Sequence, residues 1–107
     1  MKIIRCKYFP PSGYKAINIF GILFVRKNVT LTDILINHES IHTKQIWELG
    51  GIGFYLAYVG FFIWNLIKYQ NWSTSYHAIP FELESNDNEE NLEYLDSRKR
   101  WAWTAYV

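Results

Sequence analysis

The chain has little cysteine and almost no net charge. Cys6 is its only cysteine, which excludes an internal disulfide and a zinc site built from thiolates. The 11 basic side chains nearly balance the 10 acidic ones, so bulk charge gives no support to a nucleic-acid partner. Lys2, Arg5 and Lys7 interrupt any apolar run near the start. We therefore expect no signal peptide and an intracellular protein, cytoplasmic or peripherally bound to a membrane.

Apolar residues, by contrast, are abundant. Of the 107 residues, 50% are hydrophobic and 19% are aromatic, more than a small soluble domain needs. The length suits one domain over residues 1–107, which would bury roughly two-thirds of its unfolded surface. The apolar surplus indicates a face that meets a membrane, a partner or an apolar substrate.

The segment with the clearest chemistry is His38-Glu39-Ser40-Ile41-His42, which has the pattern H-E-x-x-H. On a helix, residues four positions apart lie on one face, so the two histidines can offer imidazoles to one ion. Glu39 stands one position further along and can hold a water bound to that ion. This is the arrangement of zinc peptidases, in which the glutamate is the general base.

The residues before this motif predict a small amount of sheet. Residues 3–8 alternate loosely and predict a short strand, and residues 14–26 are rich in β-branched and aromatic side chains. They predict one or two further strands, with Gly21 at a bend or bulge. Residues 19–25 are also a candidate edge on which an extended substrate could pair as an added strand.

The motif itself is predicted to lie in the middle of a helix. Thr30 and Asp33 have the spacing of a capping box, with Thr30 at the N-cap. Apolar residues then recur at helical intervals over residues 31–49, and Gly50-Gly51 is a natural stop. The histidines therefore fall on or beside an apolar face, where a buried metal ligand belongs.

Residues 49–67 carry no charged side chain and are just long enough to cross a bilayer. A straight crossing would put His42 and every later candidate ligand roughly 30 Å apart, too far to share an ion. We therefore predict a helix over residues 52–69 packed on the first one. It is either a buried core helix or one that contacts a membrane surface. Its aromatic stripe is interpreted as core rather than as a substrate pocket: Phe54, Tyr58, Phe61 and Trp64.

The rest of the chain predicts one more long helix. Residues 71–77 are polar and predict a connecting loop, after which Pro80 suits a first helical turn that continues to about Leu95. The expected fold is α+β and minimal zincin-like, with short N-terminal strands followed by about three packed α-helices. Three aromatic residues should fold back on the body: Trp101, Trp103 and Tyr106.

A catalytic zinc needs three protein ligands and an open position for water, so a third ligand must come from outside the motif. The downstream candidates are His77, Glu82 and Glu84. A metzincin would have a histidine at position 48, where this chain has Glu48, and that class is excluded. The alternative role for Glu82 and Glu84 is that of ordinary acidic residues at a helix N-terminus.

The segment from Phe81 to Asn86 resembles the E-x-x-A-D segment of gluzincins, in particular the membrane-associated CAAX-processing and BlaR-type peptidases. The whole layout is also similar to that of a family of small bacterial proteins. These have a KAINIFG-like strand, an N-H-E-x-I-H helix, an aromatic helix and an I-P-F-E-x-E segment. The resemblance implies a Zn²⁺ ion held by His38, His42 and Glu82.

The resemblance also implies supporting residues. In those peptidases an aspartate usually fixes a ligand histidine, and Asn86 stands at its position with a hydrogen-bond acceptor but no charge. Glu84 is a second candidate for orienting a histidine and an alternative third ligand. For stabilising an oxyanion, His77, Tyr76 and Arg98 are candidates by their position in the sequence.

We therefore expect a zinc-dependent metallopeptidase that hydrolyses a peptide or protein substrate, with Glu39 as general base for a metal-activated water. The alternative is a non-catalytic, zinc-stabilised protein that binds a membrane surface, through residues 52–69, or a partner. The fourth coordination position separates the two functions. A water beside Glu39 favours catalysis, whereas a fourth protein ligand such as His77 favours a structural role.

Overall fold

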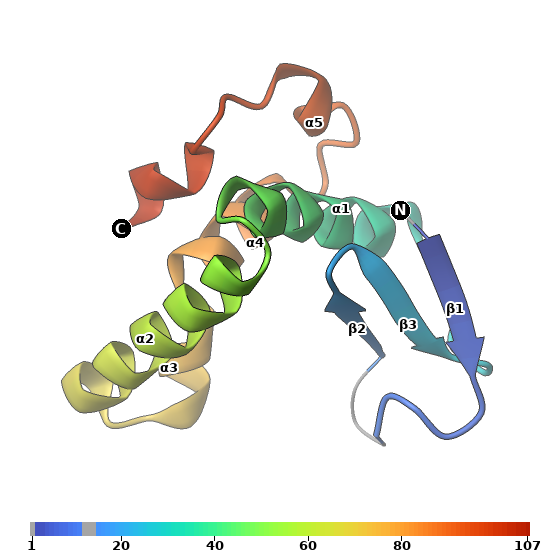
Figure 1. Ribbon diagram of the computed structural model, residues 1–107, viewed down its shortest axis with the longest axis horizontal. Helices are drawn as coiled ribbons and strands as arrows, with labels where there is room; N and C mark the ends of the chain where they lie inside the picture. Colours follow the sequence, from blue (N-terminus) through green and yellow to red (C-terminus); the bar gives the residue numbers. More distant parts are fainter. Residues whose placement is uncertain (1, 12–14) are drawn as a thin grey trace.

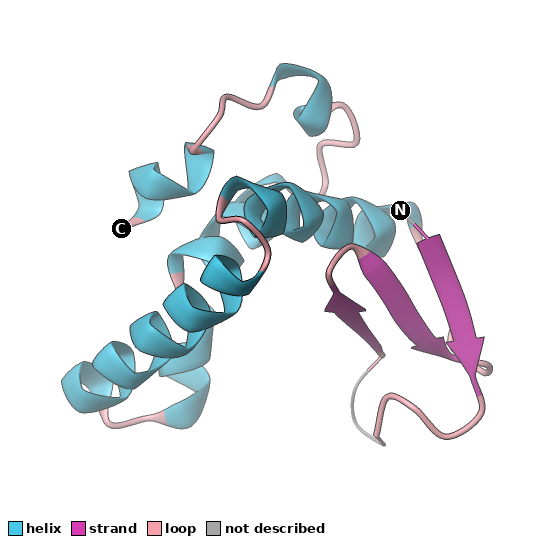
Figure 2. Ribbon diagram, in the orientation of Figure 1, coloured by secondary structure: helices cyan, strands magenta, loops and turns pink. Residues whose placement is uncertain are grey.

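The computed structural model describes residues 2–11 and 15–107, with a small sheet at one end and helices over the rest (Figure 1, Figure 2). The predicted α+β class is confirmed, with more helices among the described residues than the three expected. Position 14, part of an expected strand, lies outside the described residues. The elements in chain order are β1 (Lys2–Cys6), β2 (Ala16–Ile19), β3 (Ile22–Arg26), α1 (Asp33–Glu48), α2 (Ile52–Tyr69), α3 (Trp72–His77), α4 (Pro80–Asn88), α5 (Tyr94–Ser97) and the 3-10 helix η1 (Ala102–Tyr106).

The sheet has the strand order β1-β3-β2, with β1 parallel and β2 antiparallel to β3. β2 and β3 form a hairpin whose turn is Phe20-Gly21, with φ of 51° and 87°. Two-residue hairpin turns need this left-handed backbone, which explains the glycine predicted at a bend. Leu23 and Val25 alternate on β3 and are fully buried, so this central strand faces the core.

The strand beside α1 is β2, which is an edge of the sheet. The Nδ2 atom of Asn18 donates to the carbonyl of Glu39 and to Thr43 Oγ1, both at 3.0 Å, and this ties the edge to α1. The prediction of an edge at residues 19–25 is wrong, because most of that range lies in β3, which has strands on both sides.

α1 begins after Thr32, whose side chain accepts a hydrogen bond from the backbone N–H three residues on. The predicted capping box starting at Thr30 is therefore wrong. Thr32 has the extended backbone of an N-cap, and Asp33 then lies in the first turn, where its charge complements the helix dipole. Gly50 and Gly51 follow the helix with φ of 72° and 82°, which confirms the predicted stop.

The segment predicted as a loop, 71–77, is instead largely the helix α3. The side chain of Asn71 accepts a hydrogen bond from the backbone N–H of Thr74 at 2.9 Å. This is ordinary N-capping chemistry, and the Asn-x-x-Thr spacing was its signal in the sequence.

α4 begins at Pro80 as predicted but ends at Asn88 instead of near Leu95. The side chain of Asn37 on α1 donates from Nδ2 to the backbone carbonyls of Glu89 and Asn91, at 2.8 and 2.9 Å. A contact from a distant helix therefore holds the turn after α4, and local sequence could not reveal it.

The core lies where α1, α2 and α4 meet. Its centre is Phe81, whose ring lies 4.8 Å from that of Phe54 and 4.9 Å from that of Trp103. Tyr106 donates a hydrogen bond to Asp87 at 2.7 Å, so the C-terminal aromatic residues fold back as predicted. The buried members of this cluster are Ile46, Phe54, Ile79 and Phe81.

α2 covers the predicted residues 52–69 and packs against the body on one side only. By length and composition alone it could cross a membrane. Only 11% of its 18-residue window is buried, so the predicted alternative of a buried core helix is wrong. The interpretation of Trp64 as core is wrong, because its side chain is exposed. Five aliphatic side chains, which we call the outer stripe, recur at helical spacing and are more than half exposed: Ile52, Leu56, Val59, Ile63 and Ile67.

Candidate metal centre

α1 presents His38 and His42 on one face, as their spacing predicts. Their Nε2 atoms lie 3.1 Å apart and their rings meet almost at right angles, at 81°. His42 is buried and His38 is partly buried at the rim. The two imidazoles therefore direct the same ring atom at a single point.

Glu82 approaches that point from α4. Pro80 occupies the first turn of this helix and places the carboxylate opposite α1. Glu82 Oε1 lies 3.5 Å from His38 Nε2, and Glu82 Oε2 lies 3.3 Å from His42 Nε2. One ligand atom from each of the three residues lies within 4.8 Å of the others, so the group could hold a metal ion.

The distance between the two histidine nitrogens is close to that between two ligand atoms of a tetrahedral zinc ion. Zinc binds nitrogen and oxygen at about 2.0–2.1 Å, so two of its tetrahedral ligand atoms lie about 3.3 Å apart. Here the two Nε2 atoms lie 3.1 Å apart, and each faces a different oxygen of Glu82, at 3.5 Å for His38 and 3.3 Å for His42. Two imidazoles with one carboxylate are also a ligand set that suits zinc.

Each histidine has a further contact at its other ring nitrogen. His38 Nδ1 lies 2.9 Å from Glu89 Oε2, and His42 Nδ1 lies 2.8 Å from Gln45 Oε1. Such contacts fix ring orientation at metal centres. Sequence reasoning assigned this role to Asn86, whose side chain is exposed, or to Glu84, which contacts Gln45 and not a histidine ring. It missed both Glu89 and Gln45.

Glu39 lies in the same pocket and is almost fully buried. Its Oε2 atom is buried without a hydrogen-bond partner among the described residues. Burial raises the pKa of this carboxyl group by more than the neighbouring histidines lower it. A carboxylate with an unpartnered oxygen and a raised pKa is suited to taking and returning a proton.

Glu82 and His42 form a coupled pair. Burial lowers the pKa of His42, but the Glu82 carboxylate outweighs this and raises it to about 9. For Glu82, burial favours a higher pKa, yet its hydrogen bonds with the two histidines hold the pKa well below its usual range. At neutral pH the metal-free site therefore holds a proton on His42, which a divalent cation would displace.

Two tyrosine hydroxyls also reach the site. Tyr58 donates to Glu82 Oε2 at 2.9 Å, and Tyr76 lines the pocket nearby. Burial and the Glu82 charge raise the pKa of Tyr58 and raise that of Tyr76 to about 12, so both stay neutral donors. Sequence reasoning placed Tyr58 in the core. The Tyr58 hydroxyl is the only hydroxyl in the aromatic stripe, and this was the feature of the sequence that could have indicated a polar role.

The site opens into a pocket of about 290 Å³. One wall is the edge strand β2, and the others are mainly apolar and aromatic side chains from the helices. Besides the four residues His38, Glu39, His42 and Glu82, the lining consists of Ala16, Ile17, Asn18, Ile46, Phe54, Tyr55, Tyr58 and Tyr76.

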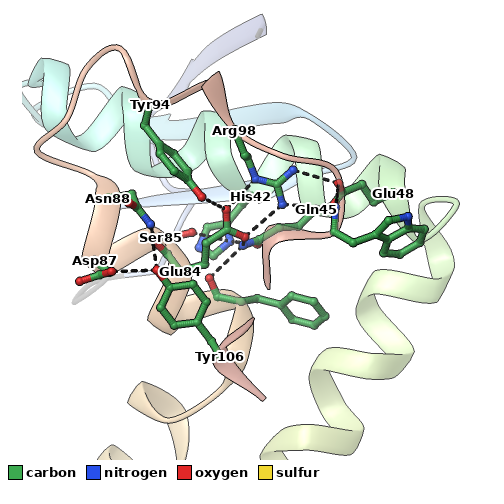
Figure 3. A network of polar contacts seen from close by, with 12 residues as sticks. His42, Gln45, Glu48, Glu84, Ser85, Asp87, Asn88, Tyr94, Arg98 and Tyr106 are labelled. Atoms are coloured by element: carbon green, nitrogen blue, oxygen red, sulfur yellow. Dashed lines mark hydrogen bonds and ion pairs between the residues drawn. The ribbon is translucent and has the colours of Figure 1, made fainter. Parts of the chain in front are cut away.

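Three other predicted residues lie away from the ligand group. Glu84 is fully buried and accepts hydrogen bonds from Arg98 Nε at 2.6 Å and from the Tyr94 hydroxyl at 2.7 Å (Figure 3). Arg98 is thereby engaged by carboxylates and does not line the pocket. His77 is exposed at the end of α3. Of the predicted oxyanion donors, only Tyr76 lines the pocket.

Comparisons of this chain with models of protein families, with curated proteins and with solved structures gave no match. The resemblance to gluzincin peptidases therefore stays a prediction. The site is identified here by its geometry: two imidazoles and a carboxylate with ligand atoms within 4.8 Å of one another, next to a buried carboxylate oxygen without a partner among the described residues.

Proposed function

We propose that this chain is a zinc-dependent metallopeptidase with His38, His42 and Glu82 as ligands and Glu39 as general base. The observation that carries the proposal is the convergence of ligand atoms from three residues, all within 4.8 Å of one another, beside the unpartnered Oε2 atom of Glu39. A zinc ion bound there would polarise a substrate carbonyl and lower the pKa of a water ligand towards neutral.

Glu39 carries the proton transfers in this proposal. Its free Oε2 atom accepts a proton from the water as the water oxygen attacks the scissile carbonyl carbon. It then returns that proton to the amine nitrogen as the carbon–nitrogen bond breaks. The raised pKa of Glu39 keeps its protonated form accessible between the two transfers.

The two tyrosines have separate roles. Tyr58 holds Glu82 Oε2 and so orients a ligand. Tyr76 lines the pocket with a neutral hydroxyl and is our candidate donor to the carbonyl oxygen as negative charge develops on it.

The substrate of this site is proposed to be an extended peptide. Ala16, Ile17 and Asn18 of the edge strand β2 line the pocket, so a peptide can pair with this strand while it passes the metal ligands. The aromatic walls formed by Phe54 and Tyr55 suit an apolar side chain beside the cleaved bond.

A purely structural zinc is the competing function. Structural zinc sites take four protein ligands, whereas the group found among the described residues has three. His77, the fourth ligand considered from sequence, is exposed on α3. Both observations support an open position and therefore the catalytic proposal.

The test is metal analysis combined with the Glu39→Gln variant. We expect about one zinc per chain in both proteins, and cleavage of a denatured protein substrate only by the wild type. Loss of the general base should reduce the rate by about 100-fold or more. Glu90→Gln, which removes an exposed carboxylate, is the matched control and should leave the rate unchanged. Equal cleavage by wild type and Glu39→Gln would contradict the enzymatic proposal.

The outer stripe of α2 supports a membrane surface as the place where substrate is met. No charged residue lies between Glu48 and Lys68. α2 therefore lacks the charged side chains beside the apolar stripe through which paired helices usually recognise a second copy of the same chain. Exposed Trp64 lies in the last two turns of α2, and exposed Tyr69 and Trp72 lie at or just beyond its C-terminal end, near Lys68. Aromatic residues and lysine in such a position are typical of the bilayer boundary.

Flotation with phosphatidylcholine–phosphatidylglycerol vesicles tests this contact. We expect wild type to float with the vesicles and Leu56→Gln/Ile63→Gln to stay behind, with unchanged zinc content. Thr104→Ala, on an exposed position far along the chain, serves as the control. The membrane proposal is wrong if wild type does not float with the vesicles and instead sediments as a dimer. In that case the double substitution should dissociate the dimer.

A further inference from the structure

Behind His42 lies a buried relay of polar groups that no sequence motif indicated (Figure 3). Gln45 and Glu84 are both fully buried. The Nε2 atom of Gln45 donates to the carbonyl of Phe81 at 3.1 Å and to Glu84 Oε1 at 3.0 Å. Its other amide atom, Oε1, lies 2.8 Å from His42 Nδ1.

The orientation of the Gln45 amide is fixed by what surrounds it. The carbonyl of Phe81 only accepts hydrogen bonds, and so does the carboxylate of Glu84, to which Arg98 and Tyr94 already donate. The NH2 group of Gln45 must therefore face these two acceptors. A flipped amide would bring two oxygens together at both contacts.

The orientation of the Gln45 amide determines which ring nitrogen of His42 carries a proton. With Gln45 Oε1 facing the ring as an acceptor, His42 Nδ1 must carry a proton and donate it. The unprotonated nitrogen of a neutral His42 is then Nε2, the atom that faces His38 Nε2 and Glu82. Gln45 therefore selects the tautomer that a metal ion needs.

The relay is anchored on three separate segments. Arg98, which follows α5, donates to Glu84 on α4 and, through both Nη atoms at 2.9 Å each, to Glu48 on α1. Gln45 and Glu48 are three positions apart on α1, so Arg98 clamps the helix on the side that carries Gln45. His38 has no comparable support, since its partner Glu89 has a side chain that is 30% exposed.

We propose that Gln45 is a positioning residue for His42, and that Glu84 and Arg98 fix the direction of its amide. In this assignment, which rests on the proposed metal centre, Gln45 touches neither substrate nor metal. It keeps a proton on His42 Nδ1, so that Nε2 is the ring nitrogen from which a metal ion displaces the proton.

The main test is Gln45→Met, which keeps the volume but removes the acceptor. Zinc affinity, measured by competition with a chromogenic chelator, should fall about 10- to 100-fold. Asn65→Leu is the control, because it removes another buried amide, whose Nδ2 donates to Ser75 O at 3.1 Å away from the site. Its zinc affinity should match wild type. An equal loss in both variants, or no loss in Gln45→Met, would overturn the assignment.

A second readout does not depend on metal. In metal-free protein at alkaline pH, where the imidazoles are neutral, nitrogen-15 NMR should show His42 in the Nδ1–H form in wild type and as a mixture in Gln45→Met. Glu84→Gln, which removes one of the two obligatory acceptors that orient the amide at position 45, should also increase the share of the other tautomer if Gln45→Met does not fold. Unchanged tautomers in every folded variant would refute the role of Gln45. Failure of wild type to bind zinc would instead refute the metal centre.

Discussion

The two sides of α4 carry two glutamates with opposite surroundings. Glu82 and Glu84 are two positions apart, which on a helix is a rotation of about 200°. Glu82 therefore faces the histidine pair and Tyr58, whereas Glu84 faces Arg98 and the relay behind α1. One short acidic segment thus provides a candidate metal ligand on one side and a structural anchor on the other.

The charged partners of the two glutamates explain why Glu82, and not Glu84, is the candidate metal ligand. Arg98 is a permanent cation, so Glu84 is neutralised whether or not a metal is present, and its pKa is lowered by hydrogen bonds that outweigh burial. The partners of Glu82 are imidazoles, whose protons a cation can displace. A buried carboxylate held by histidines indicates an exchangeable site, and one held by arginine indicates a fixed one.

The largest effect should follow from Glu82→Gln. A neutral amide is a poor zinc ligand, and its NH2 group would also meet the histidine nitrogens, so zinc affinity should fall by at least about 100-fold. Chelator competition measures this loss, and thermal unfolding of metal-free protein checks that the fold persists. Affinity within a few fold of wild type would mean that the ligand group has been misassigned.

Glu84→Gln should affect stability more than metal binding. It removes the charge from a buried pair with Arg98, although Glu48 still neutralises the arginine. We expect a loss of about 2–3 kcal/mol in the free energy of unfolding, measured by urea denaturation, and a smaller loss of zinc affinity than in Glu82→Gln. If the two variants show the reverse order of zinc affinities, the comparison between the two sides of α4 fails.

Local signals explain how much of the site was predictable. The spacing of His38 and His42 needs only one helix, so it could be read directly from the sequence. Glu82 and Glu84 could not be separated by spacing alone, and the preference for Glu82 came from the resemblance. Gln45 could not be predicted, because its role depends on Glu84, 39 positions away, which faces it only after α1 and α4 pack.

The same reasoning applies to the fold. The bounds of α2 and the hairpin bend at Gly21 follow from composition and backbone preference, which are local. The early end of α4 depends on Asn37 of α1, which binds carbonyls beyond the helix end, and so tertiary contact overrides helix propensity. α3 is the exception, since its capping residue Asn71 was visible and was overlooked.

A change of pH should have an intermediate effect on the stability of the metal-free protein and on its zinc affinity. Because the pKa of His42 is raised from 6.5 to about 9, its ion pair with Glu82 stabilises metal-free protein fully below pH 6.5. That contribution is lost as the pH rises through about 9. Zinc must displace this proton, so its affinity should rise about tenfold per pH unit between these limits. In Glu82→Gln the proton is held less tightly, and the dependence should weaken.

Calorimetry measures the proton directly. Zinc titrations at neutral pH in buffers of different ionisation enthalpy should show about one more proton released by wild type than by Glu82→Gln. The same comparison with Glu84→Gln should show no difference from wild type, since Glu84 does not face His42 Nε2. Equal proton release by all three proteins would show that His42 is not protonated in the metal-free site.

The smallest effect should come from Asn86→Asp, which restores the charge that the resembling peptidases have at this position. Asn86 is exposed, and the Nδ1 contacts of the ligand histidines are made by Glu89, Gln45 and Ser85. The added carboxylate therefore has no histidine to hold, and zinc affinity by chelator competition should stay within about twofold of wild type. A tenfold gain would mean that Asn86 turns inward when metal binds. In that event the support of the site would follow the peptidase pattern more closely than the relay through Gln45.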